Sequence, residues 1–197
     1  PATGTPTFIP TSTPTRTTVP ATGTPTFTPT PTAMPATATA TPTATSSTTG
    51  DWSTYQNVKY SFHFKFPPGS TVDNQSDSGG RLYLPIIAGT NLVQKILDVN
   101  VGENVSSCNV SGTHRVDTSE NVTYNGIQFL KETWSEAATS HMGDYTVYST
   151  TKGNAFIILS FLLWSVVPEV MVTPPPVFNR AAESAVFSTI MSTYTNQ

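Results

Sequence analysis

Hydrophobic and polar residues alternate strictly over residues 60–66, which read Tyr-Ser-Phe-His-Phe-Lys-Phe. In an extended chain this pattern places four aromatic side chains on one face and three polar side chains on the other, as in a half-buried strand. Pro67, Pro68 and Gly69 follow and end the strand. Comparable runs predict strands over 81–88, 95–101, 127–136, 145–151 and 155–164. The sequence therefore predicts about six strands, with turns at Gly79-Gly80, Asn125-Gly126 and Gly153-Asn154.

The end of the chain changes to helical periodicity. Apolar and small residues recur at helical spacing between residues 177 and 194, and the prolines before them suit a first helical turn. A second, shorter helix is possible around residues 89–97. The predicted class is α+β, an antiparallel sheet of about six strands covered by a C-terminal helix. The apolar run over 155–164 falls well short of the roughly 20 residues that span a bilayer, so we expect a buried strand and no membrane insertion.

Residues 1–50 show neither period. They contain ten of the 17 prolines, 21 threonines and a single charged residue, Arg16. Such a segment lacks the contiguous apolar residues needed to offset the entropy of ordering. Its composition is typical of an extended, O-glycosylated stalk. We therefore expect a Thr/Pro-rich arm over 1–50 and one globular α+β domain over 51–197, which is close to the usual size of a single domain.

The arm contains an internal repeat and a few bulky residues. Residues 1–8 recur identically as residues 20–27. The bulky apolar residues are either incidental in a low-complexity tract or anchors that dock on neighbouring molecules, and the assembly anchors would be Phe8, Ile9, Val19, Phe27 and Met34. In polyproline II geometry the two phenylalanines would lie roughly 59 Å apart. Candidate O-glycosylation sites are Thr5, Thr7, Thr13, Thr15, Thr24, Thr26, Thr28, Thr30 and Thr32.

Four Asn-x-Ser/Thr sequons occur in the globular part and are candidate N-glycosylation sites: Asn74, Asn104, Asn109 and Asn121. Such sequons arise by chance in a chain rich in Ser and Thr, so the arm is the stronger signal. Together they predict an extracellular or cell-surface protein that carries covalent glycans. The net charge of −3 and the dispersed Lys and Arg residues argue against a nucleic-acid partner, which needs a basic patch.

Candidate catalytic and metal-binding groups are sparse. Cys108 is the only cysteine, and an inert side chain is favoured over a nucleophile paired with His114. No pair of His or Cys residues has zinc-ligand spacing. Residues 73–80 resemble a calcium loop but lack its glycine and bidentate glutamate, so a solvated hairpin connection is favoured. Scattered carboxylates could support a hydrolase only if a cleft gathered them. We expect no enzyme activity, no metal and no cofactor.

The aromatic residues allow two interpretations. Trp52, Tyr55, Trp134 and Tyr148 could form a platform on which sugars stack, or they could pack in the core and at its rim, as most aromatic side chains do.

The segment Tyr60 to Gly69, the following β-meander and a final helix that carries Phe187-Ser188-Thr189-Ile190 resemble the PsbP-like α/β/α family. The resemblance covers about residues 52–197 and implies a binding or assembly scaffold without a shared active site. A Thr/Pro-rich stalk joined to such a domain is also similar to secreted proteins of filamentous environmental bacteria.

The leading hypothesis is a structural subunit of an extracellular filament or surface array, which would assemble with itself through the arm. The alternative is a stalk-tethered cell-surface module that binds polysaccharide or protein.

Overall fold

The computed structural model describes residues 49–103 and 115–197, and in this part the chain folds into two antiparallel sheets and one α-helix. The helix, α1, spans Arg180–Ser192. Single 3₁₀ turns span Thr49–Asp51 and Pro168–Val170. The strands are β1 (Ser53–Asn57), β2 (Phe62–Phe66), β3 (Thr71–Ser76), β4 (Gly79–Leu84), β5 (Leu92–Glu103), β6 (Thr118–Tyr124), β7 (Ile127–Ala138), β8 (His141–Lys152), β9 (Ala155–Val166) and β10 (Thr195–Asn196).

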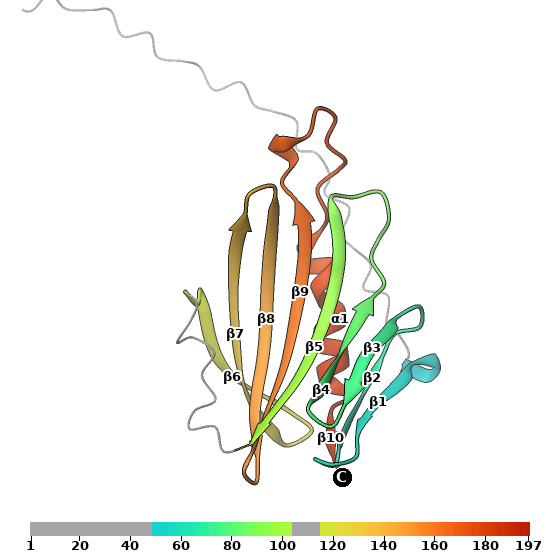
Figure 1. Cartoon of the computed structure of the whole chain (residues 1–197), viewed down its shortest axis with the longest axis vertical. Helices are drawn as coiled ribbons and strands as arrows, with labels where there is room; N and C mark the ends of the chain where they lie inside the picture. Colours follow the sequence, from blue (N-terminus) through green and yellow to red (C-terminus); the bar gives the residue numbers. More distant parts are fainter. Residues whose placement is uncertain (1–48, 104–114) are drawn as a thin grey trace, which may run out of the picture. The chain divides into compact units, whose positions relative to one another are not determined.

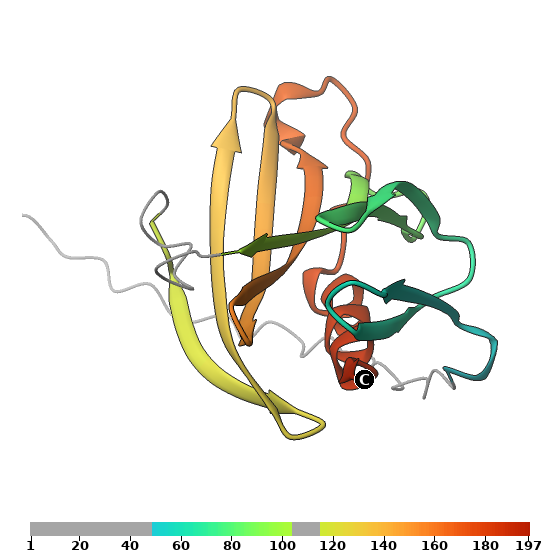
Figure 2. The ribbon, with the colours of Figure 1, turned by 60° about the horizontal axis from the view of Figure 1, so that its bottom comes forward.

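The larger sheet has seven strands in the order β3-β4-β5-β9-β8-β7-β6, and the smaller has the order β1-β2-β10 (Figure 1). Strand β9 lies at the centre of the larger sheet and pairs with β5 and β8 over nearly its whole length. Helix α1 and the small sheet lie on the same side of the large sheet (Figure 2). The core is therefore enclosed between one face of the large sheet and the layer that α1 and the small sheet form.

Helix α1 begins where Asn179 caps it, because the Asn179 side chain accepts a hydrogen bond from the Ala182 N–H at 3.1 Å. Its apolar side packs on β9, where the rings of Phe187 and Phe161 lie 4.4 Å apart between centroids. Just beyond the helix, Tyr194 stacks on the β2 residue Phe62 at 5.5 Å. These contacts join helix, large sheet and small sheet into one core.

The α+β class and the C-terminal helix are confirmed. The helix is shorter than its apolar pattern, since residues 177–179 lie before its first residue, Arg180, and residues 193–194 lie after its last, Ser192. The short helix around residues 89–97 is wrong, because Leu92 begins β5 and this strand pairs along β9. The turn at Gly79-Gly80 is also wrong: both residues belong to β4, and the turn lies at residues 77–78.

The packing around Gly79 explains why a glycine stands in a strand where the sequence indicated a turn. Its φ is +140°, and a Cβ built there would lie 1.9 Å from the Val99 carbonyl oxygen. The glycine is therefore needed for a close approach between β4 and β5 rather than for a turn.

Candidate functional site: the open face of the seven-stranded sheet

The large sheet has a second face, opposite α1, which we call the open face. Among the described residues no element lies over it (Figure 1). On β9 the open-face row alternates with the row that faces α1, and its members are Phe156, Ile158, Ser160, Leu162, Trp164 and Val166. The register places Ile96 of β5 and Tyr145 of β8 on either side of Leu162, so the centre of this face is apolar across three strands.

Strand β9 is apolar on both of its faces. The row toward α1 is fully buried, with Ile157, Leu159 and Phe161 each 0% exposed. The open-face row is half-buried at Ile158, Leu162 and Trp164. A sheet with one solvated face normally alternates apolar and polar residues, whereas continuous apolar strands are covered on both faces. Strand β9 has the composition of a strand covered on both faces.

Two aromatic stacks lie next to each other on the open face. Trp134 stacks on Tyr145 with ring centroids 5.0 Å apart and planes at 9°. His141 stacks on Trp164 at 5.2 Å and 8°. Gly143 makes room for both, because a Cβ there would lie 3.0 Å from Tyr145 Cε2 and 3.1 Å from Trp164 Cζ3. The two stacks therefore lie side by side, with Trp134 buried at 4% exposure and Tyr145, His141 and Trp164 half-buried.

Charged groups border the aromatic stacks. Arg81 donates two hydrogen bonds to the Asp98 carboxylate, at 2.6 and 2.9 Å. Burial, with smaller contributions from the charges of Glu136 and Asp98, raises the pKa of the Tyr145 phenol. Glu132 is 2% exposed, and its Oε2 accepts no hydrogen bond from the described residues. The open face thus includes a buried carboxylate oxygen that lacks a donor.

A polar pocket of about 200 Å³ lies beside the start of α1. The residues around it include Asp117, Thr133, Ser135, Asp144, Arg180 and Ser184. Asp144 accepts a hydrogen bond from the Ser135 hydroxyl at 2.6 Å. Its other oxygen lies 2.8 Å from Arg180 Nη2, an ion pair without hydrogen-bond alignment. Two of the scattered carboxylates, Asp117 and Asp144, are thus brought to one pocket, where Arg180 pairs with Asp144.

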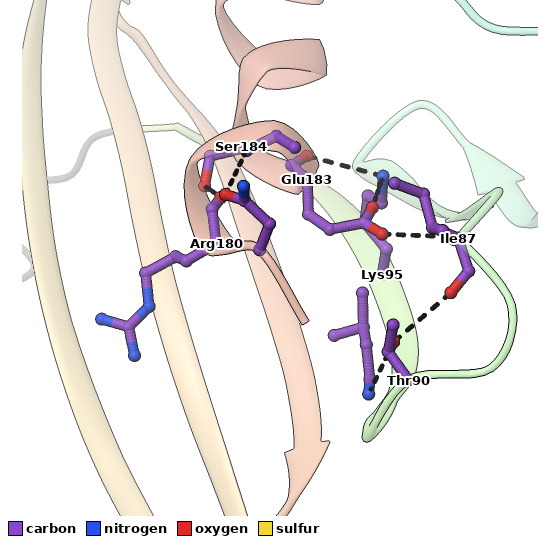
Figure 3. Close-up of polar contacts among 9 residues, drawn as sticks. Ile87, Thr90, Lys95, Arg180, Glu183 and Ser184 are labelled. Atoms are coloured by element: carbon purple, nitrogen blue, oxygen red, sulfur yellow. Dashed lines mark hydrogen bonds and ion pairs between the residues drawn. The ribbon is translucent and has the colours of Figure 1, made fainter. Parts of the chain in front are cut away.

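A buried ion pair lies on the other side of the same helical turn (Figure 3). Lys95 Nζ lies 2.5 Å from Glu183 Oε2, with side-chain exposures of 7% and 1%. The other oxygen, Glu183 Oε1, accepts the Ile87 N–H at 2.9 Å. Both carboxylate oxygens are occupied, so this pair fastens the helix and the 85–91 loop to β5 and leaves no position for a ligand.

The predicted modification and anchor sites fall mostly outside the described residues. These are the five apolar anchors, the nine threonines, Asn104 and Asn109, and also Cys108 and His114. Asn74 lies in β3 and Asn121 in β6, the two edge strands of the large sheet, and both are exposed. Residues 73–80 form the β3–β4 hairpin, as the favoured interpretation predicted.

Of the two interpretations of the four aromatic residues, packing in the core and at its rim is the one that the structure supports, and the sugar platform is not assembled. Tyr55 and Tyr148 are each 1% exposed and lie in the core, where Tyr55 stacks on Phe64 at 4.9 Å. Trp134 lies on the open face instead. The signal that sequence reasoning missed is the series at every second position of β9, which is apolar from Phe156 to Trp164 except at Ser160.

Two further findings concern the described ranges 49–103 and 115–197 alone. No group of three or more His, Cys, Asp or Glu residues could hold a metal ion there. None of the helices in these ranges has the length and apolarity required to cross a bilayer.

Comparison with known proteins shows similarity in fold only. No protein-family model matches the sequence, and a search of curated proteins finds no match. The solution structure of the cyanobacterial PsbP protein of Synechocystis sp. PCC 6803 is similar with a TM-score of 0.48 and 12% identity, over 74% of this chain and 92% of that one. A crystal structure from Bacteroides thetaiotaomicron is similar with a TM-score of 0.45 and 12% identity, over 70% of this chain and 45% of that one. Neither structure supplies a site residue or an activity.

Proposed function

We propose that this protein is a structural subunit of an extracellular filament or surface array, in which the N-terminal arm packs on neighbouring subunits. The folded domain is the repeating body, and the arm is the connection between bodies. A head-to-tail contact of this kind generates a filament when the rotation between subunits does not close a ring.

The observation that supports the proposal is the apolar open face. Strand β9 presents Ile158, Leu162 and Trp164 on a face that no described element covers. Apolar surface that remains exposed in a folded domain marks an interaction site when it is contiguous. The Thr-rich arm, with Phe8 and Phe27 in its two repeats, is a segment of the same chain that carries matching apolar groups.

Electron microscopy of the full-length protein tests the proposal. The wild type is compared with the double variant Phe8→Thr/Phe27→Thr, which keeps the length and Thr-rich character of the arm. We expect filaments or ordered arrays from the wild type and single particles from the variant. Single particles in both samples, at all concentrations tested, would contradict the proposed function.

A second candidate is a stalk-tethered binding module for polysaccharide. The polar pocket beside α1 favours it, because hydroxyl, carboxylate and guanidinium groups are the partners that sugar hydroxyls need. At about 200 Å³ the pocket is smaller than the roughly 300–1,000 Å³ of typical ligand sites, so we rank this function second. Glycan-array binding that is lost in Arg180→Ala would support it.

A further inference from the structure

We infer that the open face of one copy binds the arm, residues 1–48, of a neighbouring copy, with Phe8 or Phe27 packed against Leu162 and Trp164. The inference rests on the proposed function and names the surface on which the arm packs.

The open face has the composition of a covered surface. Ile96 and Val147, on the strands beside β9, are 5% and 1% exposed. On β9, Leu162 lies directly beside Ile96, and Ile158, Leu162 and Trp164 are only half-buried. The partly exposed apolar side chains therefore follow the central strand. A strip of this shape suits an extended chain better than a globular partner.

The arm is the part of this chain with enough apolar groups and enough length to cover the open face. Residues 104–114 contribute only Val105 and Val110 as aliphatic side chains. The arm carries Phe8, Ile9, Val19, Phe27 and Met34. In polyproline II geometry 48 residues reach roughly 150 Å. A 12-residue strand such as β9 is about 40 Å long. The arm can therefore cross the whole face with length to spare for a link between subunits.

The prolines of the arm favour docking on the open face over addition of the arm as an extra strand at a sheet edge. Proline recurs at short intervals through residues 1–35. Proline has no N–H and cannot contribute a full ladder of backbone hydrogen bonds, so this segment is a poor extra strand for the edges β3 and β6. Proline-rich segments bind instead to surfaces lined with aromatic rings. The open face provides the half-buried rings of Tyr145, His141 and Trp164, with the buried Trp134 stacked on Tyr145 as support.

The point where the arm joins the domain favours docking on a neighbouring copy. The arm joins the domain at Thr49, just before β1, and the small sheet that contains β1 lies on the α1 side of the large sheet (Figure 2). The chain therefore enters the domain on the α1 side of its large sheet, which favours the open face of a neighbour over that of the same copy.

Photocrosslinking in the full-length protein tests the inference. A photoreactive phenylalanine analogue replaces Phe27, isotopically light and heavy copies are mixed and irradiated, and crosslinked peptides are identified by mass spectrometry. The analogue at position 41, between the repeats and the domain, is the matched control. We expect crosslinks from position 27 to residues 141–166, mostly between light and heavy copies, and at least tenfold fewer from position 41.

Each other outcome overturns a stated part. Crosslinks from position 27 to another surface of the neighbour refute the open face as the docking site but keep the proposed function. Crosslinks to residues 141–166 within one copy refute docking on a neighbour. No crosslink between copies, together with single particles in the microscope, refutes both the inference and the proposed function.

A face variant gives an independent test. Leu162→Glu places a charge at the centre of the open face, and we expect at least tenfold weaker self-association in sedimentation velocity. Ile158→Gln is a milder second variant that keeps the test decisive if Leu162→Glu does not fold. Val172→Glu, at a fully exposed site, is the control and should associate like the wild type. Unchanged association of folded Ile158→Gln and Leu162→Glu refutes the inference. Unchanged association is also the result expected if the face binds a polysaccharide instead.

Discussion

The buried pair of Lys95 and Glu183 offers the sharpest test of how the first turn of α1 is held. We consider Lys95→Met and Glu183→Gln, singly and together. Lys95→Met removes the ammonium that lies 2.5 Å from Glu183 Oε2 and leaves a carboxylate that is 1% exposed. Glu183→Gln keeps an acceptor for the Ile87 N–H, which lies 2.9 Å away, but leaves a buried ammonium without its counter-charge.

Removal of one partner of a buried ion pair costs about 3–5 kcal/mol, because the remaining charge is desolvated without compensation. Removal of both charges costs much less, since neither ion is then buried alone. We therefore expect each single variant to lose about 3 kcal/mol or more, and the double variant to lose less than about 2 kcal/mol. The coupling between the two positions should then be about 4 kcal/mol, far above the few tenths expected for independent sites.

Urea unfolding at 25 °C, followed by tryptophan fluorescence, measures these differences. With a slope near 2 kcal/mol per molar urea, a loss of about 3 kcal/mol lowers the midpoint by about 1.5 M. The slope itself should not change, because the surface exposed on unfolding stays the same. Single variants within about 1 kcal/mol of the wild type, or a double variant as unstable as the sum of the two, would refute the reasoning.

Three further predictions follow from other contacts. Burial raises the pKa of the phenols of Tyr55, Tyr148 and Tyr194, so unfolded phenols ionise near pH 10 while the folded ones stay neutral. The stability that these three phenols contribute should be constant below pH 10 and fall above it by up to about 1.4 kcal/mol per pH unit per tyrosine, and Tyr194→Phe should remove about a third of their combined slope in urea unfolding between pH 9 and 11. An unchanged slope would contradict this. Gly79→Ala should destabilise by about 2 kcal/mol or more in thermal unfolding, since its Cβ would lie 1.9 Å from the Val99 carbonyl oxygen at a φ of +140°; Gly89→Ala, where the Cβ meets nothing within 4 Å, is the control with positive φ and should cost less. Gly143→Val should displace Trp164 and reduce the near-ultraviolet circular dichroism while the far-ultraviolet spectrum stays unchanged, and an unaltered aromatic signal would show that the rings do not depend on this glycine.

The sequence predicts the elements whose periodicity agrees with their burial. Phe62, Phe64 and Phe66 alternate in the chain and are buried in β2, and the run over 155–164 lies within β9. The prediction fails where tertiary pairing decides. Strand β3 is exposed at every position, and β10 has only two residues, so neither has an apolar pattern to recognise. Both exist because β4 and β2 provide partners for backbone hydrogen bonds.

The open face was not predictable from the sequence for a related reason. An apolar run indicates that a strand is buried but not which element covers each face. The even positions of β9 become a distinct surface only once the order β5-β9-β8 places Ile96 and Tyr145 beside them. That same order places Tyr148 on the face toward α1 and Trp134 on the open face, and both are buried, at 1% and 4% exposure.

The attachment of the arm to β1 has a mechanical consequence. Strand β1 is an edge strand of the small sheet and is held through its register with β2, from Ser53 opposite Phe66 to Asn57 opposite Phe62. Tension along the arm is therefore applied to the domain at Ser53 and loads the backbone pairs between β1 and β2 one after another. The first buried side chain along β1 is Tyr55, which stacks on Phe64. The load reaches the large sheet only at the end of β1, where the Gln75 side chain donates to the Gln56 carbonyl oxygen at 3.1 Å and the Asn57 side chain donates to the Asp77 carbonyl oxygen at 2.8 Å. The backbone pairs of the small sheet from Ser53 to Tyr55 should therefore break before the large sheet carries any load.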